Sequence, residues 1–144
     1  MRERSSRPPS PPPARIDDHM RPQAPDIVLL ATDWQPRALI RAQLIEEGFE
    51  VVATNTWPMM RQLLRPGIKP RLAIVDLKGL EDPGGVLNDL RVLMKPDRVL
   101  VLTAIGTVAR PDIERLGFHA LSRPVVIQQV VRSAAKALVE PAIS

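Results

Sequence analysis

Three polar side chains, each placed after a short apolar run, are the residues of this chain whose types and positions suggest chemistry. Asp76 follows four apolar residues and leads into a loop that contains Gly and Pro. Thr103 follows a second apolar run, and Arg123 comes after a third. In open α/β folds the carboxyl ends of the strands form the crevice where ligands and reactive groups collect. We therefore expect Asp76 to be accessible while the strand behind it is buried.

These side chains need strands to position them, and the sequence supplies a repeating pattern from residue 26 onward. Short apolar runs begin 20 to 27 residues apart, with helical stretches between them. Because the runs are apolar throughout and do not alternate, they are typical of strands that are covered on both faces. The candidate strands are residues 27–31, 51–53, 72–75, 99–102 and 119–121.

The stretches between the strands predict five helices. Asp33 is placed to cap the first helix, and Gly48 to stop it. The second helix starts at Thr56, the third covers residues 86–94, and the fourth covers residues 111–116. The last begins after Pro124. Gly84 and Gly85 are assigned to a turn, because the sequence has no glycine-rich phosphate-binding motif.

An alternation of five strands and five helices predicts an α/β fold. Right-handed crossovers then require a doubly wound parallel sheet with helices on both sides, a three-layer sandwich of (βα)5 type. We assume the flavodoxin-like strand order 2-1-3-4-5 by analogy, since periodicity does not give strand order. The predicted domain covers residues 26–140.

The first 25 residues differ in composition from the rest. They hold seven of the 16 prolines, five arginines and few apolar side chains. Such a segment cannot bury enough surface to offset the entropy of ordering it, so we expect a disordered Pro/Arg-rich tail. Met20 would serve equally well as the start of the protein, in which case residues 1–19 would not belong to it.

Composition excludes several classes of function. The net charge is +4, of which the first 25 residues contribute +2, and the chain has two Trp, two Phe and no Tyr, so nucleic-acid binding is disfavoured. It has no cysteine and its two histidines lack companion ligands, which makes a zinc site improbable. With no apolar run long enough to span a bilayer and no secretion signal, we expect a cytoplasmic protein without membrane contact.

The residues at the predicted strand ends resemble the receiver domain of two-component response regulators, the CheY-like family, over about residues 26–138. In the family, an aspartate at the end of the third strand accepts a phosphoryl group with the help of Mg²⁺ and a lysine. That aspartate falls on Asp76. The family's switch hydroxyl falls on Thr103, and its Lys-Pro pair falls on Arg123-Pro124. The resemblance implies that Arg123 supplies the positive charge of the lysine, although as a planar fork with a different reach.

The chain departs from the family at the metal site. Receivers normally end the first strand with two acids that hold Mg²⁺, and here those positions are Ala31 and Thr32. Asp33 comes one position later, so the implied metal ligands are reduced to Asp33 and Asp76. Mg²⁺ binds weakly without several carboxylate oxygens. We therefore expect no cofactor, or only weakly bound Mg²⁺.

Two further departures concern the switch and the cation. The family's rotating aromatic on the fifth strand is replaced by Ala120, so no ring can fill the space that a moving Thr103 would vacate. Lys78 comes two residues after Asp76, beside the metal position. We hypothesise that its ammonium replaces the missing cation and pairs with Asp76, although a surface lysine is the more common role for such a residue.

The resemblance leaves two main interpretations. The preferred one is a stand-alone atypical receiver, or pseudo-receiver: a non-enzymatic module that acts through protein–protein interaction, with impaired Mg²⁺-dependent phosphorylation. The alternative is a working receiver phosphorylated on Asp76 by a histidine kinase or phosphotransfer protein. In both cases the implied partners are a histidine kinase, a phosphotransfer protein or an output protein. The implied docking face is formed by the fourth helix, fifth strand and last helix, which also serves for homodimers.

Two other interpretations rank lower. A small enzyme or nucleotide binder on the same fold would need a phosphate loop or a nucleophile with its base, and neither is present in the sequence. The Pro/Arg-rich leader could instead recruit domains that recognise proline-rich segments.

Overall fold

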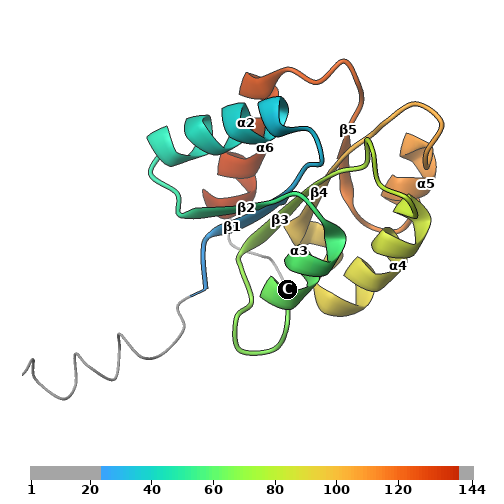
Figure 1. The fold of residues 1–144 in the computed structure, drawn as a ribbon, viewed down its shortest axis with the longest axis horizontal. Helices are drawn as coiled ribbons and strands as arrows, with labels where there is room; N and C mark the ends of the chain where they lie inside the picture. Colours follow the sequence, from blue (N-terminus) through green and yellow to red (C-terminus); the bar gives the residue numbers. More distant parts are fainter. Residues whose placement is uncertain (1–23, 140–144) are drawn as a thin grey trace, which may run out of the picture.

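The computed structural model describes residues 24–139, in which a five-stranded sheet lies between two layers of helices (Figure 1). All strands pair in parallel, in the order β2-β1-β3-β4-β5, so the predicted three-layer α/β architecture and strand order are confirmed. The strands are β1 (Ile27–Leu30), β2 (Val51–Thr54), β3 (Leu72–Asp76), β4 (Val99–Leu102) and β5 (His119–Leu121). The helices are α2 (Trp34–Glu46), α3 (Trp57–Leu63), α4 (Pro83–Leu93), α5 (Arg110–Arg115), α6 (Ile127–Val139) and the short 3-10 helix η1 (Pro96–Arg98).

The central strands are apolar because both faces of the sheet are covered. In β1 all four side chains are buried, and successive residues enter opposite layers. Val28 and Leu30 join the core beneath α3, α4 and α5, whereas Ile27 and Leu29 join the core beneath α2 and α6. Figure 1 shows these two groups of helices on opposite sides of the sheet. Because all five strands are parallel, their carboxyl ends lie along one edge of the sheet, and the candidate site residues lie there.

The start of α4 differs from the prediction. The helix begins at Pro83, so Gly84 and Gly85 lie in its first turn and not in the turn before it. Asp82 accepts a hydrogen bond from the backbone N–H of Gly85 at 3.0 Å. Pro83 suits the first helical position because it has no backbone N–H that would need a partner there. These two local signals outweigh the low helix propensity of two glycines.

Residues 1–23 of the predicted tail and residue 140 of the predicted domain lie outside the described residues. Among residues 24–139, no helix has the length and apolar character needed to cross a bilayer.

Candidate functional site

Asp76, the last residue of β3, is buried. It is only 2% exposed, so the expectation of an accessible carboxylate is wrong. Its side chain is covered by groups that bind it. The backbone N–H of Lys78 donates to its Oδ1 at 3.0 Å, and the Arg123 guanidinium donates to the same oxygen. The carboxylate at the end of β3 is therefore enclosed, and its Oδ1 already accepts two hydrogen bonds.

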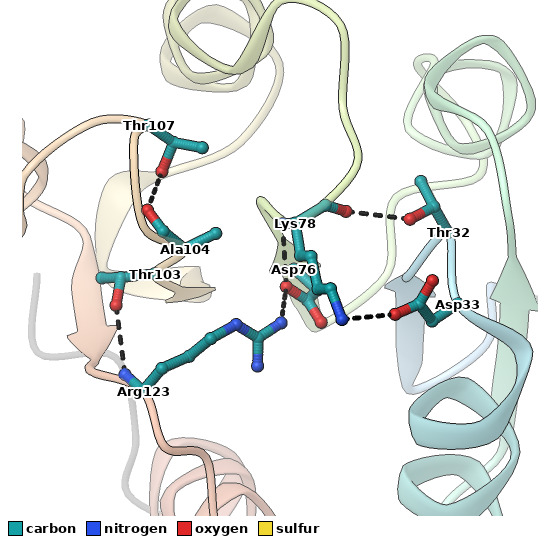
Figure 2. A network of polar contacts seen from close by, with 8 residues as sticks. All are labelled: Thr32, Asp33, Asp76, Lys78, Thr103, Ala104, Thr107 and Arg123. Carbon is teal, nitrogen blue, oxygen red and sulfur yellow. Dashed lines mark hydrogen bonds and ion pairs between the residues drawn. The ribbon is translucent and has the colours of Figure 1, made fainter.

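Arg123 reaches this carboxylate from the segment between β5 and α6. Its Nη2 lies 2.5 Å from Asp76 Oδ1, and its side chain is 25% exposed. Figure 2 shows the guanidinium extending across the edge of the sheet toward β3. The Nε of Arg123 is buried and makes no hydrogen bond within the described part of the chain. The sequence prediction that Arg123 supplies positive charge beside Asp76 agrees with this geometry.

Lys78 contacts a different acid from the one expected. Its Nζ lies 2.9 Å from Asp33 Oδ2, and among the ion pairs of residues 24–139 it has no pair with Asp76 (Figure 2). The expected Lys78–Asp76 pair is therefore wrong: the Lys78 ammonium binds Asp33, and the cation that binds Asp76 is Arg123. Only the backbone of Lys78 serves Asp76, while its exposed side chain bridges the β3 and β1 ends.

Asp33 holds the position predicted for it but not the predicted contact. It is the residue before α2, yet its side chain makes no capping hydrogen bond to that helix. The hydrogen bond and the charge of Lys78 lower the pKa of the exposed Asp33 carboxyl, and the more distant Arg123 contributes in the same direction. Asp33 is thus an anion held by an ammonium group.

The turn that follows β1 is fixed by a residue that sequence analysis missed. Nη1 of Arg37, in the first turn of α2, donates to the carbonyl oxygens of Ala31 at 2.7 Å and Thr32 at 3.2 Å. An arginine in a first helical turn carries no distinctive sequence signal, so this contact could be found only in three dimensions. It satisfies backbone acceptors at the point where the resemblance would place metal-binding acids.

Thr32 ties the β1 end to the loop after β3. Its Oγ1 donates to the carbonyl oxygen of Lys78 at 2.9 Å (Figure 2). The next residue, Gly79, has φ +82, and a Cβ at this position would collide with the Thr32 Oγ1. This close approach explains why a glycine is required there. The loop that carries Lys78 is therefore held against β1.

Thr103, the hydroxyl residue after β4, is held by the β5 end. Its Oγ1 accepts a hydrogen bond from the backbone N–H of Arg123 at 3.3 Å, and its own N–H donates to Leu121 O at 2.9 Å. Ala120 is 5% exposed in the core beside it. The structure thus brings Asp76, Thr103 and Arg123 to one edge, as predicted.

Each of the two acids at the site is paired with a cation, and the Arg37 guanidinium adds a third positive charge at the end of β1. No group of three or more His, Cys, Asp or Glu side chains that could hold a metal ion occurs among residues 24–139.

The similarity of this chain to known proteins lies in its fold. No protein-family model matches the sequence, and no curated protein matches it at a significant level. Many solved structures do match. The receiver domain of the Francisella response regulator 1452 is 15% identical, with a TM-score of 0.68, and the match covers 81% of this chain and 96% of that one.

Two further structures give the same result. The signal receiver domain of a putative Luxo repressor protein from Vibrio parahaemolyticus is 22% identical with a TM-score of 0.64, over 83% of this chain and 91% of that one. A CheY-like receiver domain protein from Methanospirillum hungatei is 18% identical with a TM-score of 0.65, over 78% and 91%. The described chain therefore has the fold of the response regulator receiver domains, the flavodoxin-like CheY fold.

Proposed function

We propose that this chain is an atypical receiver of two-component signalling that acts by protein–protein interaction and is a poor acceptor of phosphoryl groups. The observation that carries the proposal is the Asp76–Arg123 ion pair, in which the Asp76 side chain is only 3% exposed. A carboxylate that attacks a phosphoryl donor must be reachable. Here the guanidinium would first have to leave.

The donor set does not fit Mg²⁺, the ion that receivers use. A hard cation of this kind is bound through carboxylates and several waters. Asp76 and Asp33 are each paired with a cation already, and the Ala31 position offers only a buried methyl group. Without local excess negative charge, a divalent ion has little to attract it, and we assign no step of the function to it.

The face formed by α5, β5 and α6 supports a role in binding a partner. A hollow of about 500 Å³ lies along β5, the edge strand of the sheet, between α5 and α6. Leu72, Leu100 and Leu121 line its apolar part, and charged side chains from α5 and α6 line its rim. We propose that a phosphotransfer or output protein, or a second copy of the chain, docks there, without requiring phosphorylation.

The test is phosphorylation by acetyl phosphate with Mg²⁺, followed by the intact mass of the protein. The wild-type chain is expected to stay unmodified under conditions that fully modify a working receiver assayed in parallel. A triple variant, Ala31→Asp with Thr32→Asp and Arg123→Lys, restores the acids and the lysine of the family and is expected to gain phosphate on Asp76. Stoichiometric phosphorylation of the wild type, lost in Asp76→Asn, would overturn the proposal in favour of a working receiver.

A further inference from the structure

A second hollow lies at the carboxyl ends of the strands, next to the Asp76 site and on the other side of the Thr32–Lys78 link. It measures about 510 Å³ and is enclosed by the end of β1, the loop before α3 and the loop before α4. A volume of this size falls in the range of small-molecule sites. The residues that line it and matter here are Trp57, Pro58, Leu80, Val86, Glu81 and Asp82.

Both loops around this hollow are fixed by local hydrogen bonds. Thr56 Oγ1 accepts from the Met59 N–H at 3.3 Å, and Asp82 Oδ1 accepts from the Gly85 N–H at 3.0 Å. The loop before α4 is also held to β1 by Thr32. A hollow whose walls are set by capping interactions is preformed, so an occupant would pay little to order it.

Trp57 forms the apolar wall and is shared with a neighbouring hollow. The indole is partly buried against the core, and it also lines a second space of about 360 Å³ beside α4. Asp82 and Val86 line both spaces. The ring therefore separates two adjoining hollows and remains available to an occupant of either.

The charges around the two hollows have one sign. The ionisable residues that line them are Glu81, Asp82 and Asp89, and no Lys, Arg or His is among the described residues of either lining. This differs from the adjacent Asp76 site, where every acid has a cation. An aromatic face beside Glu81 and Asp89, whose carboxylates form no ion pair among residues 24–139, favours a positively charged group, which also interacts with the ring face.

From this combination we propose that the hollow beside Trp57 binds an organic cation, an ammonium or guanidinium group carried on an apolar body. The apolar body lies against Trp57 and Leu80, and the cation lies toward Glu81. The inference goes beyond the proposed function and does not depend on whether Asp76 accepts phosphate. Because Thr32 lines the hollow and bonds to Lys78, an occupant would touch the loop that carries the Asp76 site.

The test is a titration followed by the indole N–H resonances of the two tryptophans. The probe is phenethylamine, and its anionic counterpart hydrocinnamate is the matched control. The amine is expected to shift Trp57 saturably while Trp34, 70% exposed on α2, stays unchanged. The carboxylate is expected to have no effect. No saturable shift of Trp57, or equal shifts with both probes, would overturn the proposal.

Variants test the contribution of Glu81 to binding, and a third probe tests which type of cation is preferred. Glu81→Gln, at an exposed position, is expected to weaken binding about fivefold, as removal of one partly solvated charge partner does. Glu46→Gln, on α2, is the control and should leave binding unchanged; an unchanged affinity in Glu81→Gln would contradict the proposal. Tighter binding of acetyl-arginine amide than of phenethylamine would support the proposal and would favour a guanidinium over an ammonium as the bound group.

Discussion

Asp76 ends β3 almost without contact with water, and a carboxylate in such a place is costly unless it is paired and hydrogen-bonded. Arg123 supplies the charge, and the Lys78 backbone supplies a second hydrogen bond. An arginine suits this contact, because a guanidinium presents several donors in a fixed plane. Arg123 is therefore the residue that keeps the Asp76 carboxylate paired.

Replacing Arg123 by Ala should therefore destabilise the fold. The Asp76 carboxylate would stay buried without its counter-charge, at a cost of about 1–3 kcal/mol in the free energy of unfolding. Urea denaturation measures this change in the free energy of unfolding. Arg115→Ala is the control, because its ion pair with Asp112 lies at the surface and is worth less than about 1 kcal/mol. Equal unfolding midpoints for Arg123→Ala and the wild type would show that Arg123 does not hold Asp76 in solution.

Lys78 should control the ionisation of Asp33. The pair lowers the pKa of Asp33 in the folded state below its ordinary value of 3.8. Its contribution to stability is therefore present above pH 3.8 and is lost as the pH falls through the lowered pKa. In Lys78→Gln the pKa of Asp33 should rise toward the ordinary value, as measured by carboxyl carbon NMR. A pKa that does not change would mean that the ammonium does not contact Asp33.

At the scale of elements, the loop from β3 to α4 does two things at once. Near its start, the backbone N–H of Lys78 binds Asp76 and the Lys78 ammonium binds Asp33. Its last residue, Asp82, caps α4. Thr32 holds it to β1, and the contact is close enough to require Gly79. The site is thus maintained by a link between two neighbouring strand ends and not by the sheet alone.

Gly79→Ala should destabilise the protein by about 1–3 kcal/mol, since it forces a side chain into a positive φ and against Thr32. Gly84→Ala is the matched control. Gly84 lies in the first turn of α4 with open space around it, so alanine there should leave stability unchanged or raise it by up to about 1 kcal/mol. Thermal unfolding of both variants measures the difference. If Gly79→Ala were as stable as Gly84→Ala, the loop would not be held as described.

For the whole molecule, the sequence pattern was sufficient to predict a layered α/β fold, whereas the strand order came from analogy. Unbroken apolar runs predict buried parallel strands, and β4 and β5 have the predicted bounds. The start of α4 was predicted too late, because a cap and a proline outweighed two glycines. Local signals of this kind can be read from a sequence once the capping residue is recognised.

The ion pairs of the site could not be predicted from the sequence in the same way. Sequence analysis found Asp76, Thr103 and Arg123 but expected an open carboxylate and a Lys78–Asp76 pair. Which cation meets which acid depends on side-chain reach across three strand ends that meet only in the fold. A one-dimensional spacing cannot rank contacts that differ by a few ångströms, and it gave no sign of Arg37.

Asp33 and Asp76 are each paired with a cation, so Mg²⁺ should find no site at these strand ends. The most direct test is a titration of the wild-type chain with Mg²⁺, followed by the amide resonance of Lys78, whose N–H donates to Asp76 Oδ1. We expect no saturable shift at millimolar Mg²⁺ in the wild type, and a saturable shift in the variant with Ala31→Asp, Thr32→Asp and Arg123→Lys. A saturable, millimolar response of Lys78 in the wild type would contradict this expectation.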